Sequence, residues 1–326
     1  MSEAVDRLMQ RYQGAVPGAS VLVVRNGETL VLRSYGVADL EQGIATTPST
    51  NYRLASVTKQ FTAAAVLMLA EDSRLGLDDA VRRWLPSLHP AADAVSIRHL
   101  LTHTSGLVDY EDVIPATATA QLRDADVLRL LAPQNRLYFP PGGGYRYSNS
   151  GYALLALIVE RASGRAFSNF LRERIFLPAG MDGSLVQVPH GPTVQHRAYG
   201  YSELDAGWAR TDQDRTSAVL GDGGIYSSVQ DLARWDAALY GNGLLGAASR
   251  RLAFSPATAT DVRGIQYGYG WRISGDSVWH SGETIGFRNV IVRHPRQRLS
   301  VVILSNRNAP EPYATAKAIA ARFMAR

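Results

Sequence analysis

The chain has 326 residues, of which 46% are hydrophobic and 19% charged, and its net charge is +5. This is the composition of an ordinary globular protein with one large domain or two lobes. The absence of cysteine excludes disulfides, thiolate catalysis and cysteine-ligated metals. No apolar run is long enough to span a bilayer, and the scattered arginines, interleaved with acidic residues, argue against nucleic-acid binding.

The first 20 residues predict a short amphipathic helix. The stretch "MSEAVDRLMQRYQGAVPGAS" lacks the basic start and apolar centre of a signal peptide. We therefore expect a cytoplasmic protein, or a periplasmic or secreted one if the sequence is a processed form. Residues 19–39 follow as two β-branched runs around Asn26-Gly27, a dipeptide typical of a hairpin turn.

The middle of the chain shows mostly helical patterns. Helices are predicted at 56–72, 96–101, 124–132, 148–164, 167–176 and 227–243. Their ends carry expected signals: Ser96 and Ser228 as N-caps, the latter in a capping box with Asp231, Gly164 and Gly241 as C-terminal glycines, and Pro178 as a stop.

Strands return near the end of the chain. One strand is predicted at 267–273, and a second hairpin at 287–307 turns at His294-Pro295. A helical pattern at 312–326 closes the sequence.

These elements predict an α/β (α+β) fold. The strands from both ends of the chain form one antiparallel sheet flanked by helices, and the central segment forms a mainly helical lobe. The whole chain, 1–326, is then a single catalytic unit, with an α/β lobe from about 1–60 and 220–326 and a helical lobe from about 61–219. We expect a functional site in a cleft between the lobes.

Ser56 and Lys59 form a candidate nucleophile–base pair. Lys59 is one of two lysines in a chain with 34 basic residues, the other being Lys317. An ammonium can lose its proton when it is desolvated, whereas a guanidinium cannot. Residues three apart share a helix face, so Ser56 Oγ and Lys59 Nζ can meet at the start of the helix, where the dipole favours developing negative charge.

Two other stretches carry groups of the same kind. "YSN" at 147–149 lies in a Gly/Pro loop and places Tyr147 beside Asn149; alone, it is as well explained by a packed tyrosine and a helix cap. "HSG" at 280–282 has a glycine that lets a ligand approach the backbone. The N–H groups of Glu283 and Ser56 can then stabilise an oxyanion.

Together, "SVTK", "YSN" and "HSG" resemble the signature elements Ser-x-x-Lys, Tyr-x-Asn and Lys-Thr-Gly of the serine β-lactamase and penicillin-binding protein superfamily. The similarity covers nearly the whole chain and is closest to the class C branch and its esterase and D-aminopeptidase relatives. It implies the β-lactamase/transpeptidase-like fold, no cofactor or metal, and a small-molecule or peptide substrate. The resemblance leaves the oligomeric state open.

The resemblance also implies roles for individual residues. Ser56 is the nucleophile that forms an acyl-enzyme, and Lys59 hydrogen-bonds Ser56 and keeps Tyr147 acidic. Tyr147 helps to deprotonate the serine and to protonate the leaving group. Asn149 positions the substrate amide, and the N–H groups of Ser56 and Glu283 hold the oxyanion.

His280 departs from the family pattern, because many members have lysine there to bind a substrate carboxylate. A histidine, with a free pKa of about 6.5, is mostly neutral at pH 7, which disfavours β-lactams relative to esters and peptides. Arg288 is a candidate for the missing cation. No acidic general base is assignable from the sequence, so deacylation is left to Tyr147, Lys59 or His280.

Two function classes remain open. The first is a serine hydrolase acting on amide, ester or β-lactam substrates, and the second is a penicillin-recognising binding or sensor module that acylates without efficient turnover. Two further patterns favour structural roles: His99 and His103 have zinc-like spacing but no third ligand, and the glycine-rich 221–227 stretch lacks the ending of a phosphate loop.

Overall fold

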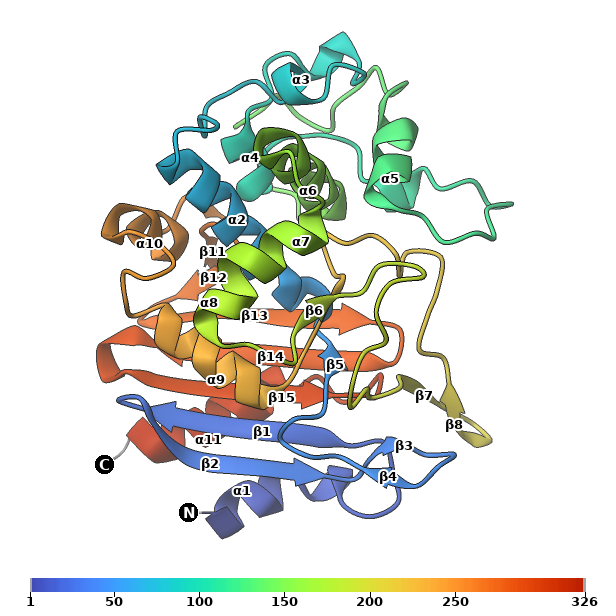
Figure 1. Cartoon of the computed structure of the whole chain (residues 1–326), viewed down its shortest axis with the longest axis vertical. Coiled ribbons are helices and arrows are strands. Elements are labelled where there is room, and N and C mark those ends of the chain that lie inside the picture. Colours follow the sequence, from blue (N-terminus) through green and yellow to red (C-terminus); the bar gives the residue numbers. More distant parts are fainter. Residues whose placement is uncertain (1, 325–326) are drawn as a thin grey trace.

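One large antiparallel sheet organises residues 2–324, the part of the chain that the computed structural model describes. Its eight strands run in the order β10-β11-β12-β13-β14-β15-β1-β2 (Figure 1). Three small sheets, β3-β4, β5-β9-β6 and β7-β8, lie outside it. The strands are β1 (Ala19–Arg25), β2 (Glu28–Tyr35), β3 (Val37–Asp39), β4 (Ile44–Ala45), β5 (Tyr52–Arg53), β6 (Leu185–Val186), β7 (Tyr201–Leu204), β8 (Gly207–Arg210), β9 (Ile225–Ser227), β10 (Thr258–Ala259), β11 (Gln266–Tyr267), β12 (Arg272–Ser274), β13 (Ser277–Thr284), β14 (Phe287–His294) and β15 (Leu299–Ser305).

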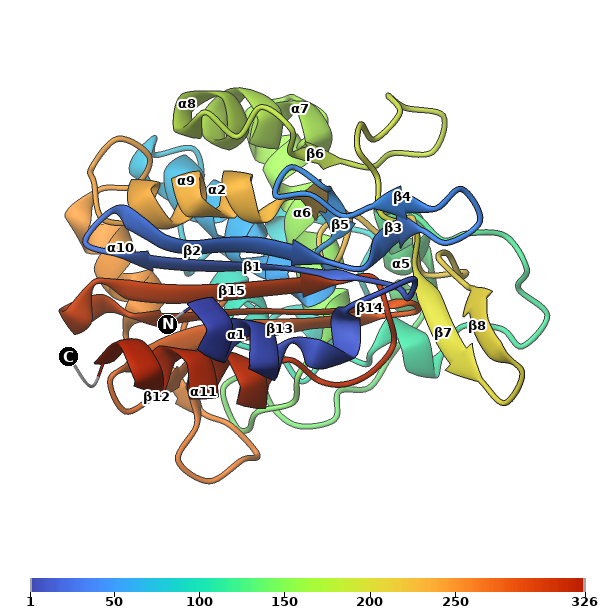
Figure 2. The ribbon, with the colours of Figure 1, turned by 90° about the horizontal axis from the view of Figure 1, so that it is seen from below.

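Helices cover both faces of this sheet. Figure 2 shows α1 and α11 on one face and α9, α2 and α6 on the other. The α-helices are α1 (Ser2–Leu8), α2 (Lys59–Glu71), α3 (Val81–Trp84), α4 (Ile97–Leu101), α5 (Asp124–Leu131), α6 (Asn149–Ser163), α7 (Phe167–Leu171), α8 (Leu177–Ala179), α9 (Val229–Ala238), α10 (Ala247–Phe254) and α11 (Tyr313–Met324). The 3₁₀ turns are η1 (Gln10–Tyr12), η2 (Ala55–Thr58), η3 (Pro90–Ala92), η4 (Tyr110–Asp112) and η6 (Pro295–Gln297), and η5 (Arg172–Phe176) is a π turn.

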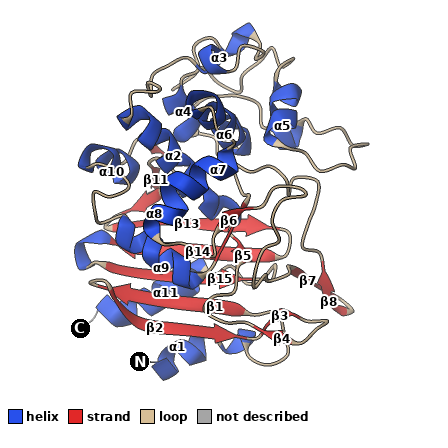
Figure 3. Cartoon of the chain, in the orientation of Figure 1, coloured by secondary structure: helices blue, strands red, loops and turns tan. Residues whose placement is uncertain are grey.

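The middle of β1 is apolar over four successive residues, 21–24, because both faces of the strand are covered. Val21 and Val23 of β1 join the core under α1 and α11, whereas Leu22 and Val24 join the larger core under the other helices. Successive side chains of a strand point to opposite faces, so a strand buried on both sides shows no polar alternation. Figure 3 shows most strands gathered at one end of the molecule and α3, α4, α5 and α6 at the other. The α/β fold class that the sequence predicts is confirmed, whereas the lobe boundaries near 60 and 220 stay a prediction.

Both hairpins are confirmed, but two elements differ from the prediction. Residues 267–273 form two short strands rather than one, because the chain bends at Gly270, which has a φ of +79°. A Cβ at Gly270 would lie 2.7 Å from the Lys59 carbonyl oxygen, so the bend packs against the start of α2. The helix from Phe167 runs past Pro178 and ends at Gly180, because the π turn before Pro178 already departs from regular α-helical bonding.

The start of α9 also differs in detail. Ser228 caps it as predicted, by accepting from the N–H of Asp231. The Asp231 carboxylate, however, bonds Gly183 N–H and Ser184 Oγ instead of completing a capping box. The helix ends at Ala238, before Gly241.

A buried ion pair joins α9 to the sheet. Arg293 Nε lies 2.6 Å from Asp236 Oδ1, and the two side chains are 1% and 3% exposed. Ser300 Oγ donates to the same carboxylate oxygen. Because removal of one partner leaves a buried charge unpaired, loss of Asp236 should be costly for folding.

We expect Asp236→Ala to lower the free energy of unfolding by about 3 kcal/mol or more. Urea denaturation measures this change. The matched control is Asp276→Ala, which breaks the exposed Arg296–Asp276 pair and should cost less than about 1 kcal/mol. If both variants lost the same small amount of unfolding free energy, the buried pair would contribute no more to stability than the exposed one.

Candidate active site

Ser56 lies on a sharp turn before α2. The 3₁₀ turn η2 runs directly into the helix, and Ala55, just before the serine, has a φ of +50°. A non-glycine residue in the left-handed region is uncommon and strained, and such conformations concentrate at functional sites. Ser56 therefore lies in this 3₁₀ turn, and not in the first turn of a regular α-helix as the sequence predicts; α2 begins only at Lys59.

Lys59 is fully buried and all three of its N–H bonds have acceptors. Nζ donates to Ser56 Oγ at 3.0 Å, to Asn149 Oδ1 at 2.8 Å and to the Asp222 carbonyl oxygen at 3.0 Å. A buried ammonium with this full set is held in one position. The structure thus brings Ser56 and Lys59 together, as their spacing suggests.

Tyr147 lies beside the same ammonium. Its ring centroid is 5.0 Å from Lys59 Nζ, and the ring packs on His103 at a centroid distance of 4.4 Å. Arg272 lies over the ring, 5.4 Å from its centroid. Within residues 2–324 the Tyr147 hydroxyl makes no hydrogen bond to another protein group.

Asn149 links Lys59 to an acidic residue that sequence reasoning missed. Its Nδ2 donates to Glu111 Oε1 at 2.9 Å, while its Oδ1 accepts from Lys59. The helix α6 is capped by the neighbouring Ser148, which accepts from Gly151 N–H. The amide of Asn149 is therefore directed to the site rather than to the helix end.

Gly282 allows β13 to pack directly on the turn that carries Ser56. A Cβ at this position would lie 2.1 Å from the Leu54 carbonyl oxygen and 3.2 Å from Val57 N. Only glycine fits such a close approach. It brings Glu283 to the edge of the cavity that Ser56 lines. The pairing of the Ser56 and Glu283 N–H groups as an oxyanion hole stays a prediction.

His280 is buried behind the site rather than in its wall. It is 1% exposed, its Nδ1 lies 2.6 Å from the Ser281 carbonyl oxygen and its Nε2 lies 3.0 Å from the Tyr267 hydroxyl. Burial, with Arg272 and Lys59 nearby, holds the pKa of His280 well below 6.5, although the contact with Ser281 opposes this. Both ring nitrogens face protein groups, which leaves neither for the substrate contact that the sequence suggests. Arg288 is instead paired with Glu311.

The two histidines with zinc-like spacing have structural contacts. His99 Nδ1 accepts from Ser96 N–H, and His103 Nδ1 accepts from Ser148 N–H. In the described part of the chain, no cluster of three or more His, Cys, Asp or Glu residues is placed to hold a metal ion. None of the helices within residues 2–324 is long and apolar enough to cross a membrane.

A cavity of about 580 Å³ opens at Ser56. Its wall is polar, and carboxylates outnumber guanidinium groups in it. The lining residues are Arg53, Ala55, Ser56, Tyr110, Glu111, Ile114, Asn149, Asp214, Arg215, Thr216, Asp222, Gly223, Glu283, Thr284 and Ile285. Tyr147 and His280 are not among them. The acidic members at 111, 214 and 222 have no local sequence signal, because Glu111 comes from η4 and the other two from the distant connection between β8 and β9.

Asp222 is the most deeply buried carboxylate in this wall. Burial raises its pKa to about 7, with Asp124 and Glu111 acting in the same direction and Lys59 and Arg53 opposing. Desolvation by neighbouring groups also raises the pKa of Glu111, although the residue is exposed at the surface, while the hydrogen bond from Asn149 lowers it. The cavity therefore contains acids that change protonation state closer to neutral pH than a free carboxyl does.

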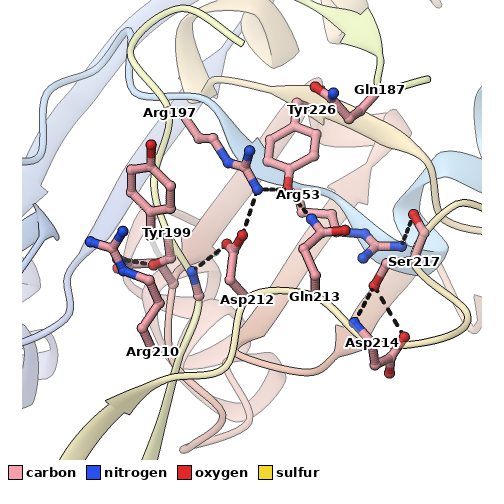
Figure 4. Close-up of polar contacts among 12 residues, drawn as sticks. Arg53, Gln187, Arg197, Tyr199, Arg210, Asp212, Gln213, Asp214, Ser217 and Tyr226 are labelled. Atoms are coloured by element: carbon pink, nitrogen blue, oxygen red, sulfur yellow. Dashed lines mark hydrogen bonds and ion pairs between the residues drawn. The ribbon is translucent and has the colours of Figure 1, made fainter. Parts of the chain in front are cut away.

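Polar contacts join the 211–217 loop to residues of β5 and β9 (Figure 4). Arg197 Nη2 contacts Asp212 Oδ2 at 2.5 Å and the Tyr226 hydroxyl at 3.2 Å. Arg53 Nη2 donates to the Ser217 carbonyl oxygen at 3.0 Å. These bonds hold the loop that contributes Asp214 to the cavity.

Comparisons with known proteins agree with the geometry. The family model described as "Beta-lactamase" matches residues 2–325. "Penicillin-binding protein 4*" of Bacillus subtilis is 35% identical over 90% of this chain and 69% of its own length, and a "D-aminopeptidase" of Gluconobacter oxydans is 30% identical over 98% of this chain and 61% of its own. A solved D-amino acid amidase from Ochrobactrum anthropi superposes with a TM-score of 0.83 at 25% identity, covering 95% of this chain and 93% of that one. The chain thus spans roughly two thirds of the length of these two curated relatives.

Proposed function

Because the chain belongs to the β-lactamase family, we propose that it is a serine hydrolase that forms an acyl-enzyme on Ser56 and acts on small amides or esters bearing an α-ammonium group. D-Amino-acid amides and peptides with an N-terminal D-residue are the substrates of this type. One observation carries the proposal: Ser56 is hydrogen-bonded to Lys59 and lines a cavity that is rich in carboxylates.

The chemistry follows from the contacts of the nucleophile. Ser56 Oγ attacks the substrate carbonyl carbon as its proton passes to Lys59, which must be in its uncharged amine form at this step. The bond from the carbon to the leaving amine or alcohol then breaks, and Tyr147 gives the leaving group a proton, which Tyr147 later regains from Lys59. The N–H groups of Ser56 and Glu283 stabilise the oxyanion. The acyl group then remains on Ser56 until water removes it.

The cavity charge supports the choice of substrate. Glu111, Asp214, Asp222 and Glu283 line it, against Arg53 and Arg215. Nε and Nη2 of Arg53 donate to the carbonyl oxygens of Gly223 and Ser217, while its Nη1 has no partner among the described residues. Because His280 is neutral and buried, it does not attract a substrate carboxylate. The carboxylates of the cavity wall attract a substrate ammonium instead. The names of two relatives, a D-aminopeptidase and a D-amino acid amidase, point the same way.

A substrate panel tests the proposal. D-Alanine p-nitroanilide, its L-enantiomer, p-nitrophenyl acetate and a chromogenic cephalosporin are compared for turnover and for a mass increase on Ser56. We expect the D-anilide to be turned over with the highest kcat/KM among the amides. A stable adduct without turnover on every substrate would instead support a binding or sensor module.

Glu111→Gln should raise KM for D-alanine p-nitroanilide about tenfold, because a hydrogen bond to a charged group contributes about 1.5–3 kcal/mol. The glutamine side-chain oxygen can still accept from Asn149, so the link to Lys59 is kept. p-Nitrophenyl acetate has no ammonium and is the control substrate for steady-state kinetics. Equal losses on both substrates would mean that Glu111 acts through Asn149 and not on the substrate.

A further inference from the structure

Asp222 contacts the catalytic lysine through its backbone and has a carboxylate oxygen that no protein group uses. The residue is 7% exposed and lines the same cavity as Ser56. Its backbone oxygen accepts from Lys59 Nζ at 3.0 Å and its Oδ2 accepts from the Tyr110 hydroxyl at 3.2 Å. Within residues 2–324 no group donates to its Oδ1, so this oxygen is available to a molecule in the cavity.

The loop that carries Asp222 is fixed from several sides. Both oxygens of the Asp124 carboxylate accept backbone N–H groups, from Leu220 and Gly221, at 3.0 Å each. Thr62 Oγ1 donates to the Gly221 carbonyl oxygen at 2.7 Å. A Cβ at Gly221 would lie 2.2 Å from the Tyr152 carbonyl oxygen, so the loop also packs closely on α6. The position of the Asp222 carboxylate is therefore determined before a substrate binds.

The surroundings of Asp222 suit a proton acceptor. Within residues 2–324 its carboxylate forms no ion pair, although Lys59 and Arg53 act on it electrostatically. The charged and titratable groups that face it are Lys59 from α2, Arg53 from β5, Tyr110 and Glu111 from η4, and Asp124 from α5. With a pKa of about 7, the carboxylate can take up and release a proton at neutral pH, as a general base must.

We propose that Asp222 is the general base that activates water for hydrolysis of the acyl-enzyme, an assignment that rests on the proposed function. Water attacks the acyl carbonyl carbon as one of its protons passes to Asp222 Oδ1. The oxyanion collapses, the bond from carbon to Ser56 Oγ breaks, and Oγ takes a proton from the Lys59 ammonium. The carboxylic acid product returns a proton to Lys59, and Asp222 loses its proton to solvent.

Asp222→Asn tests the assignment, because an amide keeps the size and the Tyr110 contact but cannot accept the proton. With p-nitrophenyl acetate we expect a burst of p-nitrophenol equal to the enzyme concentration. Deacylation should then be slower by about 100-fold or more, the usual scale of general-base catalysis. Intact-mass measurement should show the acyl adduct on Ser56, and the thermal unfolding midpoint reports folding.

Two further measurements sharpen the result. Hydroxylamine is a better nucleophile than water and should cleave the accumulated ester, restoring turnover in Asp222→Asn. In the unchanged protein, deacylation should increase as pH rises through about 7, where the Asp222 carboxylate ionises, and this dependence should disappear in the variant. Asp276→Asn is the control, since it removes an exposed carboxylate that does not line the cavity and should produce no accumulated adduct.

The outcomes separate the two proposals. A raised KM with unchanged deacylation would overturn the inference and make Asp222 a substrate-binding carboxylate. A folded Asp222→Asn variant that forms no adduct would also overturn it, by placing Asp222 in acylation. If the unchanged protein itself forms no adduct on Ser56 during turnover, the proposed function fails instead.

Discussion

Replacing Ser56 with alanine is expected to lower kcat/KM for p-nitrophenyl esters and D-amino-acid anilides by about 10⁴-fold or more, the scale on which serine hydrolases lose activity without their nucleophile. We expect no other residue to replace Ser56 as the nucleophile, because its Oγ is the hydroxyl that Lys59 Nζ contacts, at 3.0 Å. The acyl adduct seen by mass spectrometry should disappear along with turnover.

Folding should survive this substitution. Lys59 keeps two of its three acceptors, Asn149 Oδ1 and the Asp222 carbonyl oxygen, and the third can be replaced by water because Ser56 lines an open cavity. The thermal unfolding midpoint checks this expectation. Ser202→Ala is the control, since Ser202 contacts Thr211 on a distant hairpin and its loss should leave kinetics unchanged. Activity retained by Ser56→Ala, with an adduct elsewhere, would overturn the assignment of the nucleophile.

Features set by neighbours in the chain could be predicted from sequence. The Asn26-Gly27 turn joins β1 and β2 as expected, because both the turn chemistry and the strand patterns lie within about twenty residues. The meeting of Ser56 and Lys59 is likewise local, since three residues of helical backbone bring them to one side. Such features need no knowledge of the rest of the fold.

Features set by packing between distant segments were missed. Glu111 and Asp222 lie in different loops, 111 residues apart in sequence, yet both line the cavity at Ser56. Neither has a periodic or spacing signal. The sequence around Asp222 predicts only a glycine-rich turn. The structure shows that Gly221 allows this turn to pack closely on the backbone of Tyr152.

His280 shows that a residue can match the position of a family motif and still lack the expected contact with substrate. The sequence places it on a strand beside the site, and β13 does lie there. Its partner Tyr267 comes from β11, however, which the sequence joins to β12 as one strand. The bend at Gly270 between these strands is fixed by contact with Lys59 of α2. The burial of the imidazole was therefore outside the reach of local patterns.

Because Lys59 is buried beside Ser56, Lys59→Arg tests directly whether its amine transfers a proton in the reaction. We expect kcat/KM to fall by about 10³-fold, within the range for loss of a general base, because a guanidinium keeps its proton near neutral pH. The same chemical change at the other lysine, Lys317→Arg, is the matched control. Lys317 lies on α11 at the ring of Tyr313, on the far face of the sheet, and its replacement should leave activity unchanged.

A second variant separates proton transfer from simple misfit, since arginine is also larger than the space that holds Lys59. The chain contains no cysteine, so Lys59→Cys introduces a single thiol that bromoethylamine converts into a near-copy of lysine. We expect the cysteine variant to be inactive, and to recover activity after alkylation and refolding, as measured by ester turnover and intact mass. Lys59→Arg with nearly full activity would mean that position 59 needs only a fixed positive charge. Alkylated protein that is folded but inactive would show that the amine does not take part in the reaction.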